Sequence, residues 1–182
     1  METITFASTN QNKYLEVQSI LSTRNISVNF SRTHLVEVQS DSLEEIAREK
    51  AKTAFAKVGR PVIVEDDGLF IDSLGGFPGP YSSFVFKTIR NDGILKLLAG
   101  SAKRSAYFCS LIAFYNGKTM SVSEGRVDGR ISDRITEGGW GYDPIFMPAG
   151  TDLTFAELKK RKNEYSHRKR ALEKFARWYL KL

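Results

Sequence analysis

Short apolar runs alternate along this chain with segments whose apolar residues recur at helical spacing. The runs over 3–8, 26–31 and 62–64 are rich in β-branched and aromatic residues, which is typical of buried strands. Residues 10–24 and 42–58 place apolar side chains three and four positions apart, as amphipathic helices do. The alternation predicts a mixed α/β fold with a central β-sheet flanked by helices.

Residues at two helix starts support this assignment. Asn10 is a favourable N-cap for the first helix, and Ser42 followed by Glu45 has the spacing of a capping box. The strand that opens at 62 is expected to run into the carboxylates of residues 65–67, and a strand is expected to resume at 69–71.

The second half of the chain predicts a hairpin and further elements. Strands over 105–115 and 119–131 flank Asn116-Gly117, a strong hairpin signal. The remaining expectations are a rigid loop over 75–80, a helix over 92–98, a loop over 138–141, a short strand over 144–147 and a final helix capped by Ser166 that buries Leu172, Phe175, Ala176 and Tyr179.

Length and composition narrow the class of protein. A chain of 182 residues that is 41% hydrophobic can bury a sizeable core as one domain over residues 1–182, or as two closely packed lobes. No apolar run approaches the ~20 residues of a membrane span, and the first residues lack the pattern of a secretory signal. The single cysteine, Cys109, lies in an apolar run, so we expect a packed strand residue and a cytoplasmic, reducing location.

The net charge of +6 is concentrated near the C-terminus. Residues 157–182 hold ten Lys/Arg against three Asp/Glu. Three interpretations stay open for this stretch: a solvated helix face, a nucleic-acid surface, or one wall of a site for an anionic small molecule.

The turn from Ser8 to Lys13 joins the first strand to the first helix. Backbone N–H groups at a helix start attract anions, and Lys13 would add a full positive charge beside a bound phosphate. The glycines of a P-loop are absent. The alternative is a capped helix that binds nothing.

Three adjacent carboxylates, Glu65, Asp66 and Asp67, follow a buried strand. They repel one another, and a divalent cation such as Mg²⁺ is the simplest neutraliser for hard oxygen ligands. Successive strand residues point to opposite faces, so Asp66 faces away from the other two. A solvated surface turn is the alternative.

Other candidates carry cations and aromatic rings. Lys50 falls on the apolar stripe of its helix, where it either extends to water along its aliphatic stem or lines a site for an anion. The glycine-rich loop around Trp140 and Tyr142 suits stacking on a base, or is an aromatic-anchored structural loop. Lys162 and the His167-Arg168 pair flank the start of the final helix. With one cysteine and two histidines, the chain lacks the ligands of a zinc site.

Five motifs occur in a specific order. They are Ser-Thr-Asn-x-x-Lys at 8–13, Val-Glu-Asp-Asp-Gly-Leu at 64–69, Gly-Gly-Phe-Pro-Gly-Pro-Tyr at 75–81, Gly-Trp-Gly-Tyr-Asp-Pro-Ile-Phe at 139–146 and Ser-His-Arg at 166–168. In this order the chain resembles the inosine triphosphate pyrophosphatase family over nearly its whole length, and its shorter loops are similar to the archaeal branch. The resemblance implies an elongated sheet in two lobes with a cleft between them.

The resemblance also implies an activity and a catalytic set. The expected reaction is Mg²⁺-dependent hydrolysis of deaminated purine nucleoside triphosphates (ITP, dITP and XTP) to the monophosphate and pyrophosphate, with Mn²⁺ as an alternative metal. Glu37 and Asp66 match the metal ligands, Asp66 also matches the general base, and Lys50 matches a phosphate-binding lysine counted with the catalytic residues.

The remaining family positions match substrate contacts. Relatives often carry Ser or Thr at the position of Asp67, and some carry a basic residue where this chain has Ser82-Ser83-Phe84. The implied substrate-binding residues are Ser8, Thr9, Asn10, Gln11, Asn12 and Lys13 for the triphosphate, and Trp140, Gly141, Tyr142 and Asp143 for stacking on the base. Lys162, His167 and Arg168 match the remaining base and phosphate contacts, and Asp67 matches a further substrate contact.

The resemblance implies a homodimer with neither membrane nor nucleic acid as a partner. Two other functions stay open: a related pyrophosphatase for methylated or pyrimidine triphosphates, and a non-enzymatic nucleic-acid-binding module that uses the basic final helix.

Overall fold

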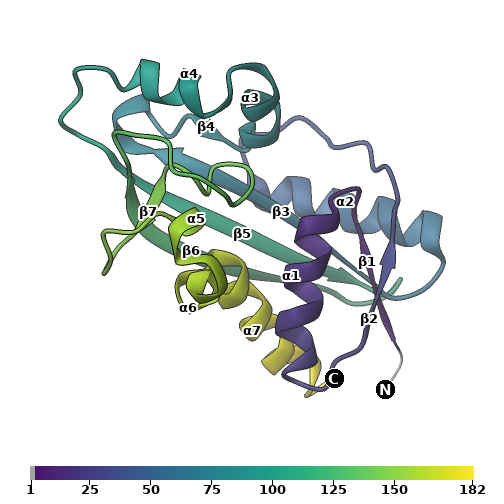
Figure 1. The fold of residues 1–182 in the computed structure, drawn as a ribbon. Coiled ribbons are helices and arrows are strands. Elements are labelled where there is room, and N and C mark those ends of the chain that lie inside the picture. The colour runs from purple at the N-terminus through teal and green to yellow at the C-terminus, as the bar shows by residue number, and fades with distance from the viewer. Residues whose placement is uncertain (1–2) are drawn as a thin grey trace. The chain divides into compact units, whose positions relative to one another are not determined.

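The computed structural model describes residues 3–182 and confirms the mixed α/β fold. Seven strands form a sheet in the order β2-β1-β3-β5-β6-β7, and β4 pairs with β3 outside this path (Figure 1). The strands are β1 (Ile4–Ala7), β2 (Val28–Ser31), β3 (Val62–Ile71), β4 (Pro78–Gly79), β5 (Ser105–Tyr115), β6 (Met120–Ile131) and β7 (Phe146–Pro148).

Helices account for most of the other regular structure. None of them, within residues 3–182, is long and apolar enough to cross a membrane. The α-helices are α1 (Gln11–Ser22), α2 (Leu43–Val58), α3 (Ser82–Thr88), α4 (Arg90–Leu97), α5 (Phe155–Leu158), α6 (Lys162–Tyr165) and α7 (His167–Tyr179), and short 3₁₀ helices cover Asp72–Leu74 and Lys159–Arg161.

The chain divides into two compact units. Unit 1 contains the chain up to Asp66 together with Ser110–Gly125 and Arg168–Leu182, whereas unit 2 contains Asp67–Cys109 and Arg126–His167. Strands β3, β5 and β6 each pass from one unit into the other. One domain over residues 1–182 stays a prediction.

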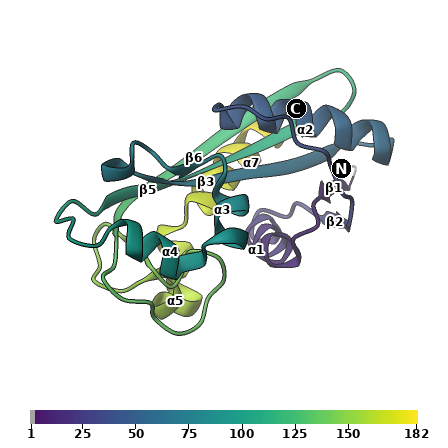
Figure 2. The same ribbon diagram turned by 90° about the horizontal axis from the view of Figure 1, so that it is seen from above.

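The core of unit 1 lies between its sheet and helices α1 and α7. Side chains of Phe6, Ile63, Leu21 and Phe175 belong to this core and are at most 1% exposed. Figures 1 and 2 show α2 on the opposite face of the sheet from α1. Strand β1 runs parallel to both β2 and β3, so the loops after β1 and β2 leave the sheet at the same end.

Strand β3 runs unbroken where we expected an interruption, so that prediction is wrong. Phe6 pairs with Ile63, which places Glu65 and Asp66 just past the carboxyl end of β1. Ile63 lies in the core under α1 and α7, so by strand alternation Glu65 faces those helices and Asp66 faces the side of α2.

The predicted helix starts are confirmed in unit 1 with one correction. The Asn10 side chain accepts hydrogen bonds from the backbone N–H groups of Asn12 and Lys13. The Ser42 hydroxyl accepts a hydrogen bond from the N–H of Glu45. The Glu45 carboxylate accepts one from the Ser40 hydroxyl, and not from the Ser42 N–H as a capping box requires. A nearer hydroxyl donor therefore replaced the second half of the box.

Unit 2 has its own core, built from β3, β5 and β6 together with α3, α4 and α5. Leu69, Ile94, Phe146 and Phe155 belong to it and are at most 1% exposed. Helix α4 contains most of the predicted 92–98 segment but ends one residue earlier, at Leu97, whereas α3 was missed.

Candidate functional site

A buried group of charges lies in unit 1 under α1 and α7. The Nε of Arg168 donates to both carboxylate oxygens of Glu65 at 2.8 Å, and a terminal nitrogen donates to Glu16. Ser110 adds a hydroxyl donor to Glu65 at 2.7 Å, and the ammonium of Lys13 lies 3.9 Å from the same carboxylate. Arg168 and Glu65 are 0% and 3% exposed, so both charges depend on these partners for neutralisation.

A second pair of opposite charges lies on α2 and in the loop after β2. The ammonium of Lys50 donates to the Glu37 carboxylate and, at 3.2 Å, to the main-chain carbonyl of Glu65. The Lys50 side chain is 11% exposed and that of Glu37 is 51% exposed. Asp66, which is 8% exposed, follows Glu65 on the side of α2. Unit 1 therefore brings Lys50, Glu37 and the backbone before Asp66 together.

The turn from Ser8 to Lys13 is an ordered helix entry. The Ser8 hydroxyl accepts from the N–H of Asn10 at 3.1 Å, and Thr9 is exposed. Since Asn10 occupies the N–H groups of Asn12 and Lys13, two of the donors that we expected for an anion are already bonded. The ammonium of Lys13 carries the charge that remains here, and Gln11 and Asn12 are exposed.

The glycine-rich loop of unit 2 is organised around a buried carboxylate. Asp143, 6% exposed, accepts from the Lys162 ammonium at 2.8 Å and from the N–H of Trp140 at 3.3 Å. Lys162 also lies 4.9 Å from the centre of a Trp140 ring, as in a cation–π contact. Gly139 is required here: its φ is +68°, and a Cβ would lie 2.6 Å from that of Asp143.

His167 ends unit 2 and lies among aromatic rings. Its imidazole stacks on Phe108 with centroids 4.6 Å apart and planes 9° from parallel, and its centroid is 6.1 Å from that of Phe155. Nε2 is 3.8 Å from a carboxylate oxygen of Asp67. The ammonium of Lys162 is 5.5 Å from the Phe155 ring, so His167 and the Trp140 loop belong to one connected group of side chains.

Sequence reasoning missed two residues that hold this loop, Asn91 and Ser82. Asn91 on α4, 8% exposed, donates from its side-chain nitrogen to the Gly141 carbonyl at 3.1 Å. The Tyr142 hydroxyl donates to the Ser82 carbonyl at 2.9 Å, and burial raises the pKa of Tyr142, so the phenol stays protonated. The Ser82 hydroxyl itself donates to Gly79 and accepts from the N–H of Leu69. A polar residue on an otherwise unremarkable helix offered no sequence signal for these contacts.

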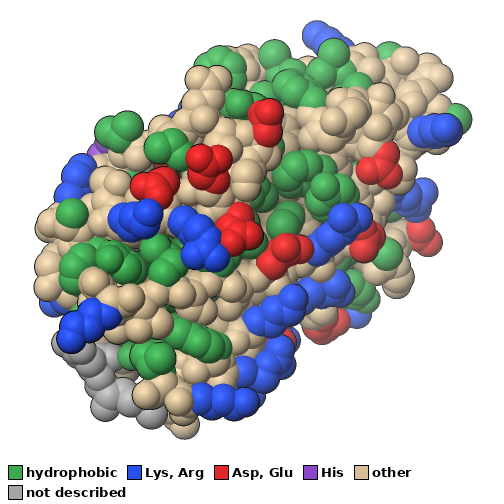
Figure 3. Space-filling model, turned by 180° about the vertical axis from the view of Figure 1, so that it is seen from behind, with side chains coloured by type: hydrophobic (Ala, Val, Ile, Leu, Met, Phe, Trp, Pro, Cys, Tyr) green, Lys and Arg blue, Asp and Glu red, His purple; other side chains and the backbone are tan. Residues whose placement is uncertain are grey.

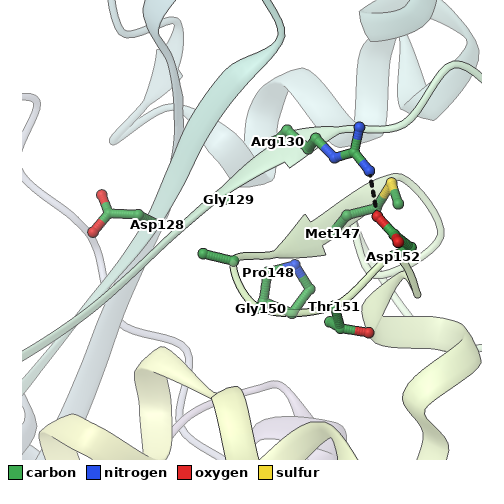
Figure 4. A pocket seen from close by; sticks show the side chains of 9 residues that line it. Asp128, Gly129, Arg130, Met147, Pro148, Gly150, Thr151 and Asp152 are labelled. Carbon is green, nitrogen blue, oxygen red and sulfur yellow. Dashed lines mark hydrogen bonds and ion pairs between the residues drawn. The ribbon is translucent and has the colours of Figure 1, made fainter.

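A pocket in unit 2 lies apart from the predicted residues in the sequence. It is lined by parts of β6 and β7 and by the turn that follows, and the Arg130 guanidinium donates to Asp152 at 2.8 Å beside it (Figure 4). The lining includes no residue that we predicted to bind substrate or metal.

Acidic and basic side chains are interspersed over the face of the molecule in Figure 3. Exposed cations often have carboxylate partners, as in the pairs Arg48–Glu44, Lys52–Glu49 and Arg126–Asp128. That face therefore carries both signs of charge and is not uniformly basic.

The donor set of unit 1 fits a hard divalent cation. No group of three or more His, Cys, Asp and Glu side chains forms a metal cluster within residues 3–182. Two carboxylates suffice for Mg²⁺, which is usually held by one or two of them together with water and substrate phosphates. Glu37 already holds a cationic group, the Lys50 ammonium, so its carboxylate can be approached by a positive charge.

Comparisons with known proteins agree over nearly the whole chain. The sequence profile of the Ham1 family matches residues 4–178. The dITP/XTP pyrophosphatase of Methanopyrus kandleri is 49% identical over 97% of this chain and 95% of its own, and that of Saccharolobus solfataricus is 48% identical over 92% and 88%. The structure of a HAM1 protein from Coxiella burnetii superimposes with a TM-score of 0.87 at 31% identity and covers all of both chains.

Proposed function

Because this chain belongs to the Ham1 family, we propose that it hydrolyses non-standard purine nucleoside triphosphates (dITP, ITP and XTP) to the monophosphate and pyrophosphate. The observation that carries the proposal is the pairing in unit 1 of two lysines, Lys13 and Lys50, with the carboxylates around Asp66. Relatives that are 48–49% identical carry the name dITP/XTP pyrophosphatase, which supports the substrate class.

Unit 1 supplies the phosphate-binding groups in this proposal. A triphosphate carries about four negative charges near neutral pH, and attack on phosphorus requires that they be offset. Lys13 and Lys50 bind the phosphate oxygens. To do so, Lys13 moves away from its present partner Glu65, and Lys50 moves away from Glu37. Ser8 and Asn10 shape the turn that presents Lys13, and the exposed side chains of Thr9, Gln11 and Asn12 add hydrogen bonds to the phosphates.

We assign Glu37 and Asp66 as the ligands of Mg²⁺, for which Mn²⁺ would substitute. When bound, the cation offsets phosphate charge and polarises the reacting phosphoryl group. Asp66 orients a water molecule toward the α-phosphorus and takes up its proton as the new P–O bond forms. The bond between the α-phosphorus and the oxygen that bridges the α- and β-phosphates breaks, and pyrophosphate leaves with that oxygen.

Unit 2 supplies the base-binding groups. Lys162 occupies one face of Trp140, so we propose that the purine stacks on the other. His167, oriented by Asp67, donates to the 6-keto oxygen of hypoxanthine or xanthine, where adenine would offer an amino donor instead. An unpaired donor costs ~1–3 kcal/mol, which disfavours adenine.

Three other predicted contacts take positioning roles in the proposal. Asp143 holds Lys162 and the Trp140 backbone, and Tyr142 and Gly141 anchor the loop through their bonds to neighbouring helices. Arg168 orients Glu65 and Glu16, because its guanidinium is already bonded to both carboxylates. A homodimer, a cytoplasmic location and the absence of a nucleic-acid partner stay predictions.

The proposed activity is tested by measuring pyrophosphate release from ITP, XTP and dITP against ATP, GTP, dTTP and UTP, with Mg²⁺ and with EDTA. We expect kcat/KM for the deaminated purines to exceed that for ATP by at least about tenfold, and EDTA to abolish turnover. Faster turnover of dTTP or UTP would move the protein to the related class of pyrimidine pyrophosphatases.

Lys13→Ala is expected to weaken triphosphate binding about 10- to 100-fold and to leave inosine monophosphate binding within about twofold, because only the triphosphate tail contacts the ammonium. Calorimetric Kd values for inosine monophosphate and a non-hydrolysable triphosphate analogue measure this difference. Lys52→Ala, which removes an exposed lysine paired with Glu49, is the control. Equal losses for both ligands would reassign Lys13 to the nucleoside.

Trp140→Ala is expected to raise KM for every purine triphosphate about 5- to 100-fold, because stacking on an aromatic ring contributes ~1–3 kcal/mol per base. Steady-state kinetics with ITP, XTP and dITP measure it, and Trp140→Phe should recover most of the loss. A KM increase confined to one purine would instead indicate a contact with the edge of that base.

A further inference from the structure

Lys50 and Glu37 form an ion pair in this structure, although the proposed function assigns them to different ligands, Lys50 to phosphate and Glu37 to the metal ion. The Lys50 ammonium donates to the Glu37 carboxylate and to the Glu65 carbonyl at 3.2 Å. Glu37 is a proposed metal ligand and Lys50 a proposed phosphate contact. The ammonium therefore occupies a carboxylate that the divalent cation needs.

The two partners differ in their freedom to move. Lys50 extends from α2, whose neighbouring Ala47, Ala51 and Ala54 are fully buried, and its side chain is 11% exposed. Glu37 lies in an irregular loop, and its side chain is 51% exposed. Low exposure and the bond to the Glu65 carbonyl restrict the Lys50 ammonium, whereas the half-exposed Glu37 carboxylate has solvent on the side where a second cation would approach.

We infer that Lys50 is an exchangeable counter-ion of Glu37, which a divalent cation displaces and which is then available to the triphosphate. A dication and an ammonium on one carboxylate repel each other strongly at a few ångströms, so each weakens the binding of the other. The exchange couples the two binding events. Binding of the cation to Glu37 releases Lys50 for the phosphate, and binding of phosphate to Lys50 makes the Glu37 carboxylate available to the cation. This inference rests on the proposed function, whose metal and phosphate roles it connects.

Mn²⁺ affinity of the nucleotide-free protein, measured by electron paramagnetic resonance of the free ion, tests the exchange. We expect Lys50→Met to bind Mn²⁺ at least about tenfold more tightly than the unaltered chain, because the competing charge is gone. Lys50→Arg keeps that charge and should stay within about threefold of the unaltered chain. Lys52→Met is the matched control: it removes a lysine from the same helix, one paired with Glu49, and should change the affinity less than threefold.

Adding Glu37→Gln to Lys50→Met should abolish the gain, because the gain depends on that carboxylate. Lys50→Gln serves as a second neutral variant, and thermal unfolding verifies that each protein is folded. Unchanged or weaker Mn²⁺ binding by both neutral variants overturns the exchange, as does a gain that survives Glu37→Gln. Pyrophosphate release from ITP by the unaltered chain is measured separately. If the unaltered chain hydrolyses ITP but the neutral Lys50 variants bind Mn²⁺ no more tightly, the exchange is refuted and the proposed function is not.

Discussion

Asp66→Asn is expected to lower kcat for ITP about 10²- to 10⁴-fold, the range that a general base contributes. The amide has nearly the same size as the carboxylate but cannot accept the proton of the attacking water. Asp66 is only 8% exposed, so a substitution that conserves shape should leave the fold intact. Steady-state pyrophosphate release measures the rate, and thermal unfolding measures the stability of the same preparation.

Asp72→Asn is a suitable control for this experiment. Asp72 is exposed and follows the end of β3, so the same chemical change there should leave kcat within about twofold. Mn²⁺ titration of Asp66→Asn separates the two proposed roles of Asp66. A kcat near that of the unaltered chain would remove Asp66 from the mechanism altogether.

Arg168→Met is expected to lower the free energy of unfolding by about 3–5 kcal/mol, because it leaves the buried Glu65 carboxylate without the guanidinium that is bonded to it. Glu65 would keep the Ser110 hydroxyl and the Lys13 ammonium at 3.9 Å, but both of its bonds to the guanidinium and the bond from Arg168 to Glu16 would be lost. Urea denaturation measures the change. Methionine keeps much of the side-chain volume, so the loss reports on charge more than on packing.

Two variants complete the test of this cluster. Lys169→Met removes a half-exposed lysine from the same helix, 3.9 Å from Glu173, and should cost less than about 1 kcal/mol. Adding Glu65→Gln to Arg168→Met should recover part of the lost stability, since the buried charge disappears with its partner. If Arg168→Met is as stable as the unaltered chain but raises KM for ITP, Arg168 contacts the substrate and the positioning role is wrong.

Local pattern was a sufficient guide wherever short-range physics decides the structure. The N-cap at Asn10, the buried stripe of α2 and the turn at Asn116-Gly117 depend on neighbours within a few residues, and all three are confirmed. Helix α3 was missed because it begins at Ser82, its N-cap residue Tyr81 makes no capping hydrogen bond through its side chain, and it has only seven residues. Packing of its buried residues in unit 2 stabilises the helix, and the sequence near the helix does not indicate these tertiary contacts.

The acidic run on β3 illustrates where local reasoning ended. Repulsion between adjacent carboxylates predicted an interruption, yet β3 continues through all of them. Arg168, 103 residues away in the chain, neutralises Glu65, so a contact made only by folding removed the reason for the break. The half-formed capping box at Ser42 has a local cause instead, since Ser40, five residues before Glu45, offers it a different donor.

By itself the sequence determined the mixed α/β class, the family motifs and the residue types available for chemistry, because spacing and composition are properties of the chain. Only the tertiary structure decided which charges are partners: Glu65 with Arg168, Glu37 with Lys50, and Asp143 with Lys162. Whether two charges interact depends on the distance between them in space and on their burial. Strand pairing and helix packing determine both quantities, and the partners here are separated in the sequence by 13 to 103 positions.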